Sequence, residues 1–310
     1  EFREVFCEAT GNPPYAYQER LAAADPWPDL LEAPTGAGKT EAIVLGWLWR
    51  RRFGPAETRR ATPRRLVYTL PMRVLVEQTR NRVTHWMRKL GLAEDVGVNL
   101  LMGGETADDW DLYPERDVVL IGTQDMLLSR ALNRGYALSR ARWPMPYGLL
   151  NNDSLWVFDE VQLMGSGLAT TAQLAALRAR FGVWGACPTL WVSATLRAEW
   201  LATVNHREEA GRLKRHALTD DEWSAPPLAE RLYAPKRLRR AKHSAEDPRK
   251  LSDEIQAAHL PGTLTLVVVN TVAKAVGIFD ALQLQEQPAR TGKKGAVASQ
   301  FAAERPELLL

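Results

Sequence analysis

One eight-residue stretch limits the folds open to this chain more than any other feature. Residues 33–40 read APTGAGKT and lie between a short apolar run and the helical pattern EAIVLGWLW. Glycines let such a loop turn until successive N–H groups face an anion, while lysine supplies charge and a threonine hydroxyl can bind Mg²⁺. Ala33 departs from the strict phosphate-loop pattern, which begins with glycine. The stretch therefore predicts a phosphate-binding site made by Gly36, Ala37, Gly38, Lys39 and Thr40.

A second stretch, LWVFDEVQ at residues 155–162, strengthens this prediction. Its four apolar residues are typical of a strand that is buried on both faces. Asp159 and Glu160 follow at the carboxyl end of that strand, which is the edge where open α/β sheets bind ligands. There an aspartate can hold Mg²⁺ and a glutamate can polarise an attacking water. An acidic pair after a strand can also be a helix cap or a solvated turn, but beside a phosphate loop we expect catalysis.

Apolar runs of strand length recur between helical patterns along the first two-thirds of the chain. This alternation predicts an α/β fold with a parallel, doubly wound sheet. In the helix expected at 166–181, the candidates for the buried stripe are Leu168, Leu174, Leu177 and Phe181. Strands are expected at 66–70, 96–101, 117–123, 155–158 and 189–193, with a further helix at 72–90.

The character of the chain changes after the last of these strands. Residues 207–250 are polar, contain several prolines and include the basic run KRLRR. We expect a first lobe at 1–215 and an interlobe connection at 216–260. A strand at 264–270 and a helix at 272–284 should open a second α/β unit, at 261–310. Because one strand and one helix cannot bury a core, we expect this second lobe to be incomplete.

Composition adds little to this assignment. The 310 residues are 45% hydrophobic and 25% charged, as in ordinary globular proteins. No run of 18 apolar residues predicts a membrane span, and the first residues lack the pattern of a signal peptide. The two cysteines have no metal-ligand spacing, so we expect a protein of the reducing cytoplasm. A net charge of +3 neither requires nor excludes nucleic acid.

With both nucleotide motifs placed, the chain resembles superfamily 2 helicases over residues 5–285, and most closely the helicase of type I CRISPR systems. The most specific part is residues 129–165, in which the box usually written DEAD or DEVH reads DEVQ. The resemblance implies a RecA-like first lobe that uses ATP and Mg²⁺. It also implies two partners, single-stranded DNA and an RNA-guided CRISPR surveillance complex.

The resemblance also implies roles around the nucleotide. Gln18 would recognise the adenine edge, Asp159 would hold Mg²⁺ together with Thr40, and Glu160 would position the attacking water. Gln162, the last residue of the box, would sense the γ-phosphate. The catalytic set is therefore Lys39, Asp159, Glu160 and Gln162.

Further roles concern movement and nucleic acid. Ser193 and Thr195, in the sequence SAT, would couple hydrolysis to strand movement. Residues at three strand ends would grip the sugar-phosphate backbone, although each alone could be a helix cap or turn. The basic clusters at 50–65 and 236–240 are more often solvated faces than binding sites. The expected nucleic-acid contacts are Pro71, Arg73, Gly103, Gly104, Thr123 and Gln124.

Two motifs that such a helicase would need are missing from the sequence. No Gln-Gly-Arg-type stretch after Thr271 supplies an arginine finger, and no histidine is followed by the aspartate that a nuclease of this family needs. We therefore expect a truncated helicase with little ATP turnover of its own. Two alternatives stay open: a fragment that binds ATP and single-stranded DNA without turnover, and an RNA helicase of the DEAD-box kind.

Overall fold

The computed structural model divides into two compact units, Glu1–Ala234 and Pro235–Leu310. The division falls within the stretch 216–260 that was expected to connect two lobes. The residues that the structure describes are 1–103, 109–135, 138–195, 197–235 and 241–286.

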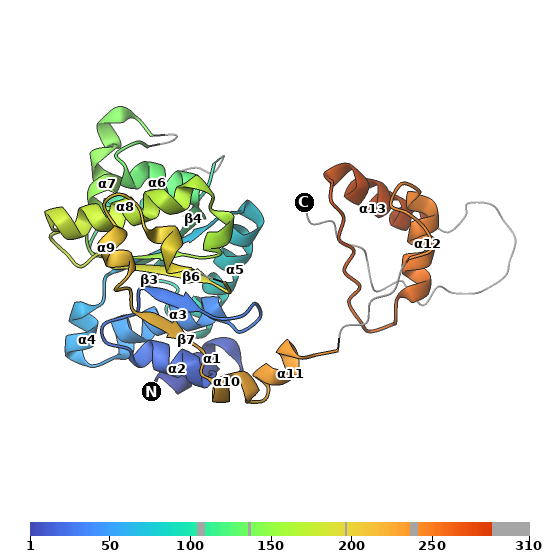
Figure 1. The fold of residues 1–310 in the computed structure, drawn as a ribbon, viewed down its shortest axis with the longest axis horizontal. Coiled ribbons are helices and arrows are strands. Elements are labelled where there is room, and N and C mark those ends of the chain that lie inside the picture. The colour runs from blue at the N-terminus through green and yellow to red at the C-terminus, as the bar shows by residue number, and fades with distance from the viewer. Residues whose placement is uncertain (104–108, 136–137, 196, 236–240, 287–310) are drawn as a thin grey trace, which may run out of the picture. The chain divides into compact units, whose positions relative to one another are not determined.

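A parallel sheet of seven strands forms the centre of the first unit (Figure 1). Five strands match the predicted apolar runs: β2 (Arg65–Leu70), β3 (Val96–Leu101), β4 (Asp117–Thr123), β5 (Ser154–Phe158) and β6 (Thr189–Ser193). The other two strands are β1 (Leu30–Glu32), which leads into the phosphate loop, and β7 (Arg215–Ala217). Their order is β3-β4-β2-β5-β6-β1-β7, and all neighbours are parallel. The predicted parallel, doubly wound sheet is confirmed.

Helices cover both faces of this sheet (Figure 1). Successive side chains of a strand point to opposite faces, so Leu66 and Tyr68 of β2 enter one hydrophobic core and Val67 enters the other. The first core is closed by α1 (Phe2–Thr10), α2 (Ala16–Ala23), α3 (Lys39–Leu48) and α5 (Arg73–Lys89). The second core is closed by α6 (Gln124–Ala131), α7 (Pro144–Leu150) and α8 (Ser166–Phe181).

Helix α8 buries a different stripe from the one predicted. Leu168 and Leu174 are buried as expected, but Leu177 is 37% exposed and Phe181 75% exposed. The prediction was wrong for these two because Arg178 takes the inward position. Its guanidinium lies over the Trp156 ring, and its Nε donates to Asn151 Oδ1 at 2.8 Å.

Short elements connect the main helices and strands of the first unit. The short elements are η1 (Trp49–Phe53), α4 (Ala56–Ala61), η2 (Asp109–Leu112), η3 (Arg140–Arg142), η4 (Val161–Leu163), η5 (Ala198–Leu201), α9 (Arg207–Ala210), α10 (Asp220–Ser224) and α11 (Leu228–Leu232).

None of the helices that the structure describes in either unit is long and apolar enough to cross a membrane.

The second unit contains two helices that pack against each other, α12 (Pro248–Ala258) and α13 (Val272–Glu286). Helix α13 confirms the helix expected at 272–284. The strand expected at 264–270 is wrong, since these residues form neither helix nor strand. A strand needs a neighbour for its backbone hydrogen bonds, and the described residues of this unit provide no other strand. The incomplete second lobe stays a prediction.

Candidate functional site

All strands of the sheet run in the same direction, so their carboxyl ends meet at one edge. The predicted nucleotide residues follow three strands that are adjacent in the sheet: the phosphate loop follows β1, Asp159 follows β5, and Ser193 ends β6. The fold therefore brings together residues that lie more than a hundred positions apart in the sequence.

The phosphate loop has the backbone shape that its glycines predicted. Gly36 and Gly38 have φ angles of +84° and +78°, in the left-handed region that side-chain-bearing residues rarely adopt. Helix α3 begins directly after Gly38, and no side chain caps its first turn. Its first N–H groups are therefore available to an anion, because an α-helix cannot satisfy them internally. The loop fits a bound phosphate.

Lys39 lies between this loop and the acidic pair. Its side chain is 7% exposed, and its Nζ lies 3.4 Å from the Ala33 carbonyl oxygen and 3.5 Å from Glu160 Oε1. Glu160 is in the left-handed region at φ 52°, and its N–H donates to Asp159 Oδ1 at 2.9 Å. The lysine and both carboxylates thus belong to one site.

Asp159 and Thr40, the two predicted Mg²⁺ ligands, lie on either side of one hydroxyl group. Tyr68 of β2 donates to Asp159 Oδ2 at 2.6 Å, and its oxygen is 3.4 Å from Thr40 Oγ1. Burial raises the pKa of Asp159, while the Tyr68 hydrogen bond and the nearby Lys39 oppose that shift. Burial, together with Asp159, raises the pKa of Tyr68 well above its ordinary value, so the phenol stays a protonated donor.

These oxygen atoms fit a magnesium ion, which prefers carboxylate and hydroxyl ligands. Sequence reasoning missed Tyr68. The available signal was a single tyrosine inside the otherwise largely aliphatic strand RLVYTL, three residues before the proline that follows the strand.

The acidic box and the SAT stretch are joined by hydrogen bonds through Gln162. Its Nε2 donates to Glu160 Oε2 at 2.5 Å, and its Oε1 accepts from Ser193 Oγ at 2.7 Å. Ser193 Oγ in turn accepts from the Thr195 N–H at 3.1 Å. The contacts therefore run without interruption from Lys39 to the end of β6.

Ser193→Ala is expected to leave ATP affinity unchanged but to reduce the stimulation of ATP hydrolysis by nucleic acid. The change removes the hydroxyl that, among the described residues, joins the Gln162 side chain to the Thr195 N–H, and losing these two hydrogen bonds costs about 0.5–1.5 kcal/mol each. Phosphate release with and without single-stranded DNA measures the effect. Thr189→Val, at the opposite end of the same strand, is the control. Full stimulation in Ser193→Ala would contradict the coupling role.

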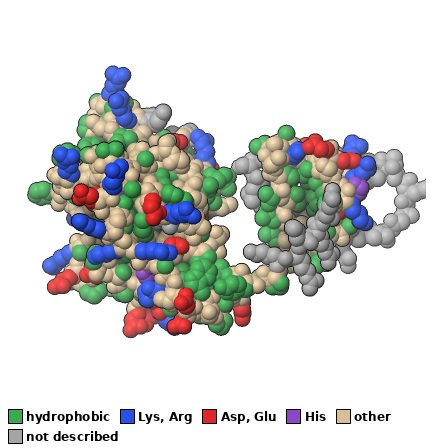
Figure 2. All heavy atoms as spheres, viewed as in Figure 1, with side chains coloured by type: hydrophobic (Ala, Val, Ile, Leu, Met, Phe, Trp, Pro, Cys, Tyr) green, Lys and Arg blue, Asp and Glu red, His purple; other side chains and the backbone are tan. Residues whose placement is uncertain are grey.

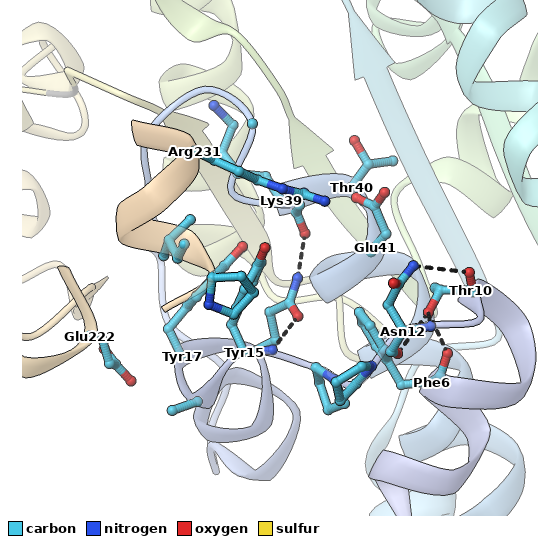
Figure 3. Close-up of a pocket in the computed structure, with 18 of the residues that line it drawn as sticks. Phe6, Thr10, Asn12, Tyr15, Tyr17, Lys39, Thr40, Glu41, Glu222 and Arg231 are labelled. Carbon is cyan, nitrogen blue, oxygen red and sulfur yellow. Dashed lines mark hydrogen bonds between the residues drawn. The ribbon is translucent and has the colours of Figure 1, made fainter. Parts of the chain in front are cut away.

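A pocket of about 670 Å³ opens beside the phosphate loop (Figure 3). Gln18 lines it and is 1% exposed. Its Oε1 accepts from the Tyr15 N–H at 2.8 Å, and its Nε2 donates to the Gly38 carbonyl at 2.9 Å. The Tyr17 hydroxyl donates to the Ala37 carbonyl at 2.7 Å. Helix α2 thus fixes the loop, and the recognition of adenine by Gln18 stays a prediction.

The expected nucleic-acid residues follow the other half of the sheet edge. Pro71 follows β2, Gly103 follows β3 and Thr123 ends β4, and these three strands are neighbours. The Arg73 side chain lies against Gly103: if that glycine carried a Cβ atom, the atom would be 2.9 Å from Arg73 Nη2. The Gln124 side chain instead packs against α8: if Gly167 carried a Cβ atom, the atom would be 2.6 Å from Gln124 Oε1. Gly104 lies outside the described residues.

Lysine and arginine side chains do not gather into one patch on the face shown in Figure 2. In the first unit they are interspersed there with acidic and apolar side chains. This view gives no support for a dominant basic surface, and the contacts expected at the sheet edge remain predictions.

The DEAD/DEAH box helicase family model matches residues 22–204, which is more than half of the chain. The chain belongs to the DEAD/DEAH box helicase family. Domains of this family bind ATP, typically with Mg²⁺, which agrees with the loop, the lysine and the acidic pair described above. No curated protein matches the chain significantly.

Solved helicase structures share the fold. Dbp5 of S. cerevisiae, bound to RNA and ADP BeF3, is 18% identical with a TM-score of 0.56, over 92% of this chain and 64% of that one. The DUF1998 helicase MrfA is 14% identical with a TM-score of 0.59, over 92% of this chain and 40% of that one. MrfA bound to DNA is 16% identical with a TM-score of 0.59, over 91% of this chain and 38% of that one. The predicted RecA-like fold is confirmed, and the chain spans less than two-thirds of each of these proteins.

Proposed function

We propose that this helicase chain is the ATP-binding lobe of an ATP-dependent translocase that moves on single-stranded DNA in type I CRISPR interference. The observation that carries the proposal is the unbroken series of contacts from Lys39 through Glu160 and Gln162 to Ser193. A site for hydrolysis alone needs no link to the SAT stretch, whereas a motor does.

The same series of contacts from Lys39 to Ser193 also favours a box that ends in glutamine, DEVQ, over one that ends in aspartate, DEAD. Gln162 donates to Glu160 and accepts from Ser193 at the same time, which an amide can do and an ionised aspartate cannot. This is the residue at which the chain departs from DEAD, and it lies in the stretch 129–165 that most resembles the CRISPR helicases.

Each group has a role in phosphoryl transfer to water. The loop N–H groups and Lys39 would hold the phosphates, and Glu160 would orient the attacking water and accept its proton. Mg²⁺ held by Thr40 and Asp159 would neutralise charge on the phosphate oxygens. Because catalysis here consists of positioning and charge stabilisation, the mutually bonded side chains suit it, and Lys39 and Asp159 among them are buried.

The choice between DNA and RNA rests on the resemblance, since Dbp5 was solved with RNA and MrfA with DNA. Phosphate release should be measured with single-stranded DNA and with RNA of the same sequence. Stimulation by DNA supports the proposal, and stimulation by RNA alone favours the DEAD-box alternative. ATP binding without any stimulated turnover favours the binding fragment. Capture of the chain by an assembled RNA-guided surveillance complex tests the CRISPR assignment.

Binding to single-stranded DNA is expected to be independent of sequence and to weaken steeply with salt, because phosphate contacts release counterions. Arg73→Ala should lower the affinity about equally for all sequences and reduce the salt slope by about 1. Fluorescence anisotropy across a salt series measures both. Arg80→Ala removes an exposed charge two turns further along α5 and is the control. A marked preference for one base sequence would contradict backbone gripping.

A further inference from the structure

One wall of the nucleotide pocket comes from a segment that was expected to be only a connection. Residues of the α10–α11 segment line the pocket together with the phosphate loop, including Glu222, Pro227, Leu228 and Arg231. The inference below rests on the proposed nucleotide site and concerns what this wall contributes to it.

Two contacts hold the α10–α11 segment against the rest of the first unit. Glu222 of α10 accepts from Arg20 of α2 at 3.0 and 2.6 Å, and the Thr219 hydroxyl caps α10. Leu228 of α11 is 2% exposed and belongs to the core that α2 and α3 share. Arg231 lies three residues after this anchor, so the position of its backbone is fixed by buried packing.

Arg231 differs in its pairing from the other cations that line the pocket. Arg3 pairs with Glu19 at 2.8 Å, Lys39 lies 3.5 Å from Glu160, and Arg82 pairs with Glu41. Within the part of the chain that the structure describes, Arg231 has no carboxylate partner. Figure 3 shows its side chain extending from α11 toward Lys39.

We propose that Arg231 binds the polyphosphate of ATP, as a cation that the nucleotide-binding lobe itself contributes. A triphosphate carries several negative charges, and within the pocket the existing carboxylates already engage the other cations. A guanidinium can donate two parallel hydrogen bonds to phosphate oxygens. Because the Arg231 side chain is exposed and has no carboxylate partner among the described residues, it would bind the phosphates without breaking an ion pair there.

The test is calorimetric titration of the 310-residue chain with ATP and, separately, with adenosine, in the presence of Mg²⁺. Arg231→Ala should weaken ATP affinity about tenfold, the size of one charge-assisted hydrogen bond, and leave adenosine affinity unchanged. Arg231→Lys should fall in between. Arg3→Ala, which removes a paired cation from the same pocket, should change ATP affinity less than about twofold. If the melting temperature of Arg231→Ala is lower than that of the wild-type chain, Arg231→Gln removes the same charge while keeping a side chain of similar size, and its ATP and adenosine affinities are compared instead.

The outcomes separate this inference from the proposed function. Unchanged ATP affinity in Arg231→Ala, with binding lost in Lys39→Ala, overturns the role of Arg231 and leaves the nucleotide site standing. Equal losses for ATP and adenosine overturn the assignment to phosphate. If Arg3→Ala loses as much ATP affinity as Arg231→Ala, then any positive charge in the pocket has the same effect. This result also overturns the specific role of Arg231. Absence of ATP binding by the wild-type chain overturns both proposals.

Discussion

Replacing Glu160 with glutamine is expected to remove the ATP hydrolysis that the chain supports, because the loss of a general base costs a factor of about 10² to 10⁴, while ATP still binds. The amide keeps a hydrogen-bonding oxygen for Gln162 but cannot take a proton from the attacking water. Phosphate release under saturating ATP and single-stranded DNA measures the loss. Titration with a fluorescent ATP analogue shows whether binding is retained.

Two further variants make this result specific. Glu41→Gln changes another carboxylate of the same pocket, one that pairs with Arg82, and should leave most of the hydrolysis intact. Asp159→Asn should weaken the Mg²⁺-dependent binding of ATP, because Asp159 shares its hydroxyl neighbour with Thr40. The same binding defect in Glu160→Gln and Asp159→Asn would contradict the division between metal ligand and base.

Lys39→Ala is expected to reduce ATP affinity by roughly a hundredfold or more, since removing one partner of a buried charge pair costs about 2–5 kcal/mol. Lys39 is almost fully enclosed between the loop and Glu160, so no neighbouring cation can take its place without moving. Equilibrium titration with the fluorescent ATP analogue measures the change, and a melting curve checks that the fold is intact.

Lys89→Ala removes a lysine from the end of α5 and serves as the control, since it lies outside the pocket. ATP affinity that stays at the wild-type level in a folded Lys39→Ala variant would show that residues 33–40 are not a phosphate loop.

The sequence was most informative where structure is local. Strands buried on both faces consist of nearly continuous apolar runs, so β2, β4, β5 and β6 could be located directly from the sequence. The phosphate loop was equally accessible, because its backbone shape depends on two glycines within the loop itself.

Features that depend on distant partners could not be located in this way. Strand β7 has three residues, and its pairing with β1 decides its structure more than its own polar composition. The opposite error occurred at 264–270, where an apolar run has no described strand to pair with. The wall at α10–α11 is held by Arg20, about two hundred positions away, so nothing near Arg231 in the sequence indicates a pocket.

Because the seven strands run in the same direction, the sheet has a carboxyl edge, where the ligand site lies, and an opposite amino edge that is free of it. The loop between α8 and β6 lies at the amino end of the sheet, and Trp184 within it is fully exposed. The N–H of that tryptophan donates to Asn152 Oδ1 at 2.7 Å, so the loop is anchored rather than loose. A tether or fluorophore attached at this position would leave the nucleotide pocket and the expected track for nucleic acid unobstructed.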